Sequence, residues 1–412
     1  MKPTSSIWLL VVIAFFLSSC TQVDAPPSRH RLYTTLERPP EHNLNRSCPD
    51  RYDDQWDYFP EKLGFRYSTQ LRVSYHRSYK VVDFVPSINR NLPLRYVLYQ
   101  CGSPRPTGFD GATFIQVPVQ RAVLNSPSLG SSAAALGVID RIYGVNDLDQ
   151  FTNEEIVRAG NEGHILALGT RGPSSIELAT TIDTDAVFLF YSANPAYNIH
   201  PALYRLGVGA VALADLFESS PLGHAEWMKF FALFFNEEAR ANSLFDGMEK
   251  RYIALRELAS HAPETQSVML GYAWERDTWT ASGGGNFFPQ FVRDAGGQYF
   301  LEKDTRPAAN VRMPFEKAMY ISSRSHVWIC GNGINRVRTK RDLIRKTPML
   351  DELFPVHRGR VFALDSNRTT GEAMPWADSS LDKPDVVLAD FISVLHPAIL
   401  PGYKPSFIRE LR

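Results

Sequence analysis

The sequence has no excess of charge of either sign, because 44 Lys and Arg residues balance 44 Asp and Glu residues. This balance removes the electrostatic argument for nucleic acid, which needs a basic excess or a basic face. Cysteine is scarce, and four cysteines in 412 residues exclude a small fold built on disulfides. No CxxC pair and no His/Cys spacing indicates a zinc site.

The sequence also lacks the common motifs of catalysis. It contains no GxSxG nucleophile elbow, no P-loop and no HExxH. Gly283–Gly285 does not match GxGxxG, and a turn that enters a helix explains it better than an anion site. The ten histidines are scattered along the chain. We therefore expect no catalytic residues, no metal site, no cofactor and no enzymatic activity.

The only long hydrophobic run lies at the N-terminus. Ile7–Leu17 has eleven apolar residues, which is short for a bilayer span of about 20 residues. The run ends in Leu17-Ser18-Ser19-Cys20, which resembles the lipobox of bacterial lipoproteins. The resemblance implies a signal peptide over 1–19, lipid on Cys20, and a membrane-anchored protein on the periplasmic or cell-surface side. An ordinary secretory signal or a short anchor helix is the alternative.

Three cysteines remain when Cys20 carries lipid. Outside the cytoplasm an odd number leaves at least one unpaired thiol. A bridge between Cys48 and Cys101 would tie the N-terminal extension to the body of the protein. Three isolated thiols, Cys330 included, are the alternative.

The chain divides into an extension, a lobe, a helix and a second lobe. Residues 20–65 are rich in Pro, Arg, Asp and Asn and are expected to form a tether and an irregular extension. Strands alternate with short helical stretches over 66–236 and again over 261–412, which favours an α/β fold with parallel sheets in both lobes.

A helix of about 36 Å is predicted between the lobes, over 237–260. Its apolar residues recur mostly three or four positions apart, which is the spacing of a helical stripe. They are Ala239, Leu244, Phe245, Met248, Tyr252, Leu255 and Ala259.

Polar and aromatic residues follow several of the predicted strands. In open α/β sheets, ligands bind beyond the carboxyl ends of the strands. Tryptophan and arginine in such loops suit a large, flat or anionic ligand. The expected ligand contacts are Arg105, Arg171, Tyr191, Tyr197, Trp274, Arg276, Trp279 and Trp376. The alternative for the tryptophans is packing on the lobe surface.

Three segments together resemble the helical-backbone class of ABC-transporter solute-binding proteins, which includes cobalamin-, ferric siderophore- and haem-binding proteins. These segments are SAAALGVIDRIYGV at 132–145, SSIE at 174–177 followed by TDAV at 184–187, and GGNFFPQFVRDAGG at 284–297. The resemblance covers about residues 70–400. It implies two Rossmann-like lobes joined by a single long helix, the class III periplasmic binding protein architecture, with little lobe closure.

The resemblance also implies partners. One glutamate on each lobe of these proteins docks onto the ABC permease, and by position these are Glu177 and Glu316. The family's proline before Asp185 is Thr184 here, and Ser325-His326 replaces the second proline-aspartate. We expect a monomer that captures a small-molecule metal chelate, a ferric siderophore first and cobalamin or haem second. A chelatase-like enzyme and a ligand sensor without a permease are the alternatives.

Overall fold

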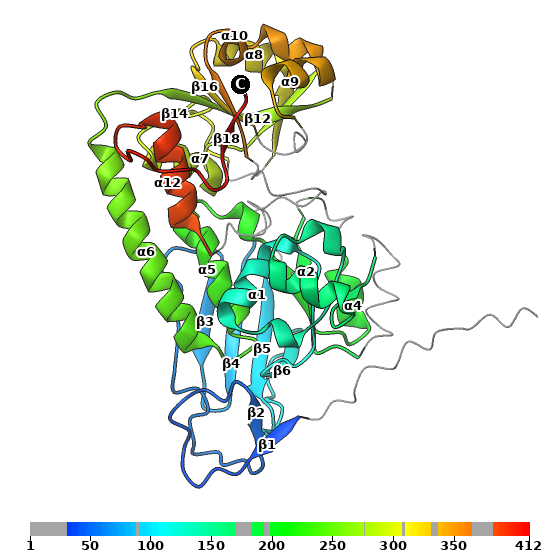
Figure 1. Ribbon diagram of the computed structural model, residues 1–412. Coiled ribbons are helices and arrows are strands. Elements are labelled where there is room, and N and C mark those ends of the chain that lie inside the picture. The colour runs from blue at the N-terminus through cyan, green and yellow to red at the C-terminus, as the bar shows by residue number, and fades with distance from the viewer. Residues whose placement is uncertain are drawn as a thin grey trace, which may run out of the picture. The chain divides into compact units, whose positions relative to one another are not determined.

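Two α/β lobes and one long helix between them make up most of the chain (Figure 1). The structure is a computed structural model that describes residues 31–87, 91, 93–169, 183–192, 194, 198–275, 277–306, 310–330, 337–364 and 382–412. The expected signal peptide over 1–19 and Cys20 lie outside these residues. Within the described ranges, no helix is both long and apolar enough to cross a bilayer.

The first lobe contains a parallel five-stranded sheet in the order β11-β10-β7-β8-β9. Its strands are short and apolar, and β7 and β11 are buried throughout, as is typical of strands covered on both faces. Their bounds are Ala122–Leu124 (β7), Ile142–Val145 (β8), Leu166–Ala167 (β9), Ala186–Phe190 (β10) and Ala210–Leu213 (β11). Helices α1 (Gly130–Leu136), α2 (Glu154–Asn161) and α4 (His200–Arg205) connect them.

A second sheet of the first lobe has the order β3-β4-β5-β6 and is mixed rather than parallel. Its strands are β3 (Leu71–Tyr75), β4 (Tyr79–Phe84), β5 (Leu94–Gln100) and β6 (Thr113–Val117). The short turn between β3 and β4 reverses the chain, so that β4 is antiparallel to both β3 and β5. Only β5 and β6 are parallel. The expectation of a wholly parallel sheet was therefore wrong for this part of the lobe.

The second lobe is built on a sheet with the order β15-β13-β12-β16-β17-β18, and β14 also pairs with β12. The bounds are Ser267–Glu275 (β12), Thr278–Ala281 (β13), Gln298–Tyr299 (β14), Val311–Pro314 (β15), Val327–Cys330 (β16), Arg360–Ala363 (β17) and Arg409–Glu410 (β18). The helices are α7 (Phe287–Asp294), α8 (Phe315–Ser322), α9 (Lys340–Lys346), α10 (Phe354–His357) and α12 (Pro384–Leu395).

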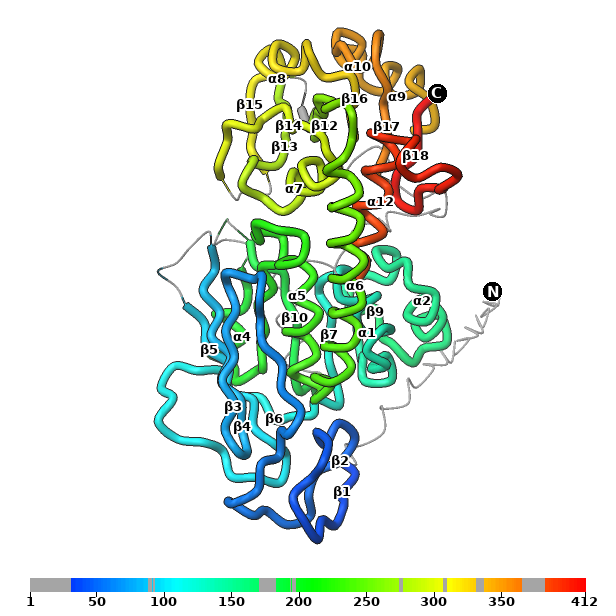
Figure 2. Tube along the Cα trace, turned by 90° about the vertical axis from the view of Figure 1, so that its left-hand side faces the viewer, coloured from blue at the N-terminus to red at the C-terminus, as the bar shows by residue number. Residues whose placement is uncertain are grey.

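Two consecutive helices link the lobes. In α5 (Pro221–Ala232) every residue is buried, and Ser220 caps its first turn by accepting a hydrogen bond from the Gly223 N–H. The long helix α6 (Glu238–Ser260) begins one residue later than predicted and packs against α5 and α12 (Figure 2). Because one apolar cluster includes buried residues of α5, α6, α7 and α12, the core is continuous from lobe to lobe.

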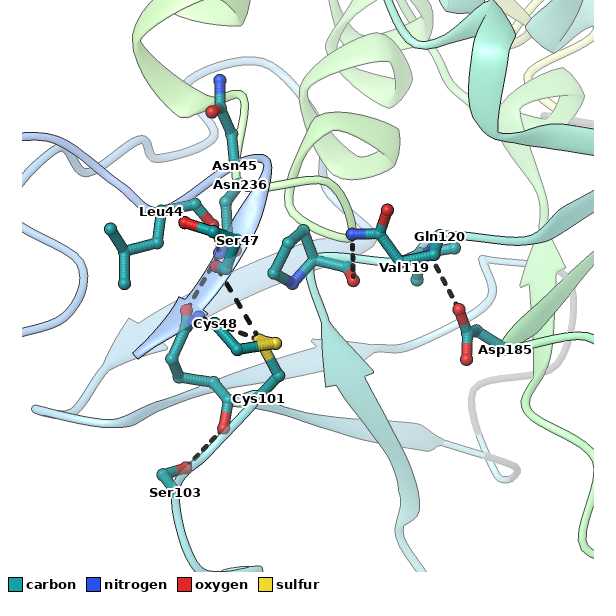
Figure 3. The surroundings of a disulfide bond; sticks show 12 residues. Leu44, Asn45, Ser47, Cys48, Cys101, Ser103, Val119, Gln120, Asp185 and Asn236 are labelled. Carbon is teal, nitrogen blue, oxygen red and sulfur yellow. Dashed lines mark hydrogen bonds between the residues drawn. A yellow bond between two sulfur atoms is a disulfide. The ribbon is translucent and has the colours of Figure 1, made fainter. Parts of the chain in front are cut away.

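The described part of the N-terminal extension packs onto the first lobe. Strands β1 (Leu32–Thr34) and β2 (Ser47–Pro49) pair in parallel. A disulfide joins Cys48 of β2 to Cys101, directly after β5, with the two Cα atoms 5.2 Å apart (Figure 3). The bridge that the sequence left open is therefore present, and it fixes the extension to the body of the lobe.

Candidate functional site

The carboxyl ends of the parallel strands in the first lobe adjoin the second lobe. Directly after β11, the Leu216 carbonyl accepts a hydrogen bond from Asn286 Nδ2, and the Glu218 carbonyl accepts one from the Phe287 N–H, both at 2.8 Å. Asn286 is the residue that caps α7 of the second lobe. This edge of a parallel sheet is where α/β folds bind ligands. We take this region, called the lobe junction below, as the candidate site.

A buried carboxylate, Asp215, lies at the lobe junction. It follows β11 within two residues, and its side chain is about 2% exposed. The carbonyl of Asp215 accepts a hydrogen bond at 3.0 Å from Nδ1 of His224, which lies in the first turn of α5. The His224 ring stacks on Phe287 of α7 with the ring centroids 4.0 Å apart. Asp215 therefore lies beside a histidine that contacts the second lobe directly.

The charge states of this pair follow from burial. Neither carboxylate oxygen of Asp215 has a hydrogen-bond partner among the described residues, and Oδ2 lies 3.9 Å from His224 Nδ1. Burial, together with the nearby Glu218, raises the pKa of Asp215 to about 7. Burial lowers the pKa of His224 to about 4, so its ring is neutral at pH 7. An acid with this pKa at the edge of the sheet is typical of a functional position.

We expect Asp215→Asn to stabilise the protein above pH 7 and to change little near pH 4. The folded-state pKa lies above the ordinary value of 3.8, so the native state holds this proton more tightly than the unfolded state. The contribution of Asp215 to wild-type stability is therefore fully present below pH 3.8 and is lost as the pH rises towards 7. The variant lacks this loss, and at about pH 8 its free energy of unfolding should exceed the wild type by on the order of 2 kcal/mol. Urea denaturation over this pH range measures the difference. Asp83→Asn, at a half-exposed carboxylate, is the control. If the free energy of unfolding changes with pH in the same way in the two variants, the raised pKa assigned to Asp215 is wrong.

Tyr191 and His200 form the edge of the lobe junction beyond β10. Their rings lie 5.5 Å apart, and Tyr191 also packs edge-on against Phe84 at 6.0 Å. Both side chains are buried, and burial lowers the pKa of His200 to about 4. The side chain of Asn198 pairs with both the N–H and the carbonyl of Ser192, directly after Tyr191. Tyr191 therefore lies buried at the edge of the sheet that the sequence predicts.

Several predicted site residues cannot be placed in the fold. Trp274 lies on β12, and its side chain is not described. The other predicted residues outside the described ranges are Cys20, Arg171, Glu177, Tyr197, Arg276 and Trp376. They stay predictions.

Arg105 lies away from the lobe junction, so the structure does not bring it together with Tyr191. Phe84 at the end of β4 pairs with Leu94 at the start of β5, and Phe84 contacts Tyr191. The start of β5 thus lies near the junction, whereas its end leads to the disulfide and to Arg105. The Arg105 guanidinium stacks on Phe114 with 3.8 Å between its central carbon and the ring centroid.

Trp279 belongs to the core of the second lobe. Its side chain has no exposed surface, and its indole N–H donates to the Leu270 carbonyl at 3.2 Å. Its ring packs on Trp328 with 5.4 Å between centroids. This arrangement matches the packing alternative for the tryptophans, so Trp279 is not included in the site proposed below.

Glu316 lies in the exposed first turn of α8, at the surface of the second lobe. Tyr320, one turn further along the same face, is 80% exposed. An open pocket of about 650 Å³ lies beside the end of α8, lined by Met319, Ser323, Glu352, Phe354, His357 and Arg358. The carboxylate is therefore available to a partner protein.

Sequence reasoning missed Asp215 and His224. The available signal was an acidic residue two positions after the buried strand 210–213, in the sequence AVALADLFE. The part of the chain that the structure describes contains no group of three or more His, Cys, Asp or Glu side chains arranged to hold a metal ion. The pair is therefore not part of a recognisable metal centre within the described residues.

No protein-family model matches the sequence. Two uncharacterised lipoproteins of Methanocaldococcus jannaschii are similar to it. One is 23% identical over 307 residues, which covers 72% of this chain and 70% of the relative. The other is 22% identical over 316 residues and covers 75% and 77%.

Solved structures share the fold at low sequence identity. A periplasmic heme-binding protein from Pseudomonas aeruginosa matches with a TM-score of 0.53 and 16% identity, over 71% of this chain and 98% of that structure. Helicobacter pylori CeuE with Ni(II) bound matches with a TM-score of 0.54 and 15% identity, over 73% and 92%. The chain thus has the fold of class III periplasmic solute-binding proteins, with two α/β lobes joined by one long helix, as the sequence predicts. Its distant relatives by sequence carry the name lipoprotein.

Proposed function

We propose that this protein is the lipid-anchored, extracytoplasmic solute-binding component of an ABC importer and binds a metal chelate at the lobe junction. The observation that carries the proposal is the meeting of the strand ends of the first lobe with α7 of the second lobe, beside a single long helix. The similar heme-binding protein and the similar CeuE with Ni(II) bound support a metal-containing ligand. The lipoprotein relatives support lipid on Cys20.

A ferric siderophore is the first candidate ligand, with Arg171 and Arg276 as contacts to its anionic groups. Cobalamin or haem is the second candidate, with Tyr197, Trp274 and Trp376 as stacking residues. A chelatase-like enzyme or a ligand sensor on the same scaffold is the second alternative.

Delivery to the permease involves Glu177 and Glu316 in this proposal. The exposure of Glu316 in the first turn of α8 supports it, because exposed charges at an interface steer the encounter and fix its register. Uptake of the ligand by cells should fall in the variant that combines Glu177→Ala with Glu316→Ala, while the affinity of the purified protein for the ligand stays unchanged. Unchanged uptake would overturn the docking role and leave the binding role intact.

A tryptophan-fluorescence titration of residues 21–412 tests solute binding. We expect saturable quenching by one ligand class among ferric siderophores, cobalamin and haem, with a Kd of about 1 μM or tighter. Trp274→Phe and Trp376→Phe should each reduce the quenching, because these residues are the proposed contacts. Trp56→Phe is the matched control, since Trp56 packs on Tyr58 in the extension. No quenching by any ligand would overturn the metal-chelate proposal and favour another solute or the enzyme alternative.

A further inference from the structure

The surface around α9 and the C-terminal end of the chain carries a local excess of positive charge. The segments 337–346 and 409–412 contain seven Lys or Arg residues and two acidic residues, Asp342 and Glu410. Because the whole chain is neutral, the rest of it carries a net negative charge. The seven basic residues, called the basic face below, are Arg338, Lys340, Arg341, Arg345, Lys346, Arg409 and Arg412.

The two segments of the basic face meet in the second lobe. The Arg412 carbonyl accepts a hydrogen bond from the Lys340 N–H at 3.3 Å. Arg409 donates to the carbonyls of Val337 and Arg338, at 2.8 and 3.3 Å. The end of the chain thus lies beside the start of α9 (Figure 2), and cations that are about 70 residues apart in the sequence are neighbours.

Much of this charge is presented to solvent. Arg341 and Arg345 are both exposed, and because they are one turn apart they share a face of α9. The side chains of Arg345 and Arg412 are 77% and 91% exposed. Each has a carboxylate neighbour, Asp342 at 2.8 Å and Glu410 at 3.7 Å, and exposed pairs of this kind are weak. Two carboxylates cannot neutralise seven cations, so the face stays positive.

We propose that the basic face binds the surface of a bilayer that contains anionic phospholipids. Lipid phosphates complement exposed Arg and Lys side chains, and each such side chain near an anionic membrane strengthens binding by about fivefold. Glu316 on the same lobe is an anion and suits a cationic partner, so the two surfaces have different partners. The proposal rests on the proposed function only through the lipid on Cys20, which keeps the chain at a membrane.

Sedimentation with lipid vesicles tests the proposal without ligand or permease. The protein would be residues 21–412, which contain every described helix and strand but not Cys20, so that no lipid anchor masks the binding. It should bind vesicles of equal parts phosphatidylglycerol and phosphatidylcholine, but not vesicles of phosphatidylcholine alone. Raising the ionic strength from about 0.01 M to about 0.1 M should weaken the binding, because the Debye length falls from about 30 Å to about 10 Å. Equal binding to both kinds of vesicle, or binding to neither, would overturn the proposal.

Two triple variants locate the binding on the surface. The variant Arg341→Gln/Arg345→Gln/Arg412→Gln should bind the anionic vesicles about 100-fold more weakly, at about fivefold for each residue. The matched control removes three exposed arginines from other elements and should bind almost as well as the wild type. It combines Arg72→Gln, Arg205→Gln and Arg256→Gln. An equal loss in the two variants would show that net charge rather than the basic face drives the binding, and the proposal would be wrong.

Failure of this proposal and failure of the proposed function give different results. A wild type that binds anionic vesicles but quenches with no ligand would contradict the metal-chelate proposal alone. A wild type that binds a ligand but no anionic vesicle would contradict the role of the basic face alone. If the basic-face variant binds vesicles like the wild type while uptake of the ligand by cells falls, the face contacts an acidic protein, and the lipid proposal is wrong.

Discussion

Replacement of Lys80 by methionine should destabilise the protein by about 3–5 kcal/mol, because it leaves the buried carboxylate of Glu238 without its counter-ion. Both side chains have no exposed surface, and their charged groups lie 2.6 Å apart. Burial lowers the pKa of Lys80, and the nearby Glu238 opposes that shift. Lys80 also donates to the Leu233 carbonyl at 2.6 Å and to Asn236 Oδ1 at 2.8 Å. One ammonium group thus connects β4, the turn between α5 and α6, and the first residue of α6.

The free energy of unfolding in urea measures this effect. Arg95→Met is the matched control, because Arg95 pairs with Asp83 on the same sheet but both are about half exposed, and exposed pairs contribute roughly 0–1 kcal/mol. The double variant Lys80→Met/Glu238→Gln should recover much of the loss, since no buried charge remains. A Lys80→Met variant as stable as Arg95→Met would show that Glu238 is reached by water.

Loss of the disulfide is the second large effect. Serine at both Cys48 and Cys101 should cost about 4 kcal/mol, because the bridge closes a loop of 53 residues and so restricts the unfolded chain. The part of the segment 43–67 that follows Cys48 lies within this loop, including Lys62 and Arg66, which contact α6. Its contacts with α6 should therefore weaken together when the bridge is absent, and amide exchange should increase along 43–67 before it increases in the parallel sheets.

Chemical denaturation with and without reductant measures the contribution of the bridge. The wild type should lose stability on reduction, whereas the double serine variant should be insensitive to reductant. Cys330→Ser is the control for a buried cysteine outside the bridge, and it should keep the sensitivity to reductant. Equal stability of the oxidised and reduced wild type would mean that the extension holds its place through its other contacts alone.

Elements with strong local patterns were predictable from the sequence. The helix predicted over 237–260 differs from α6 (Glu238–Ser260) by one residue. The segment 43–67 was not predictable as an ordered part of the chain. Its apolar pattern is irregular, and its partners on α6 lie about 180 residues away in the sequence. Its order comes from contacts that only the folded chain brings together.

The site was only partly predictable for a similar reason. The end of β10 at Tyr191 could be identified because a buried strand precedes it. Arg105 also follows a strand, but the direction of that strand in the sheet depends on its antiparallel pairing with β4, which the sequence alone does not give. Trp279 looked like a loop residue because Arg276 and Asp277 precede it, yet it belongs to the short strand β13 and points into the core. The importance of Asp215 depends on burial, which no local pattern reports.

The position of the disulfide also determines how the protein responds to mechanical force. Tension on the chain from its N-terminal side reaches β1 first and then β2, where Cys48 is covalently joined to Cys101. Only the residues from Leu32 to Ser47 can be pulled free before the load passes to the bridge, a gain in length of about 55 Å. Beyond that extension the load enters the first lobe at the end of β5, which lies away from the lobe junction. A drag on the proposed lipid anchor would therefore be borne by the disulfide and by the mixed sheet, while the strand ends that face the second lobe remain unloaded.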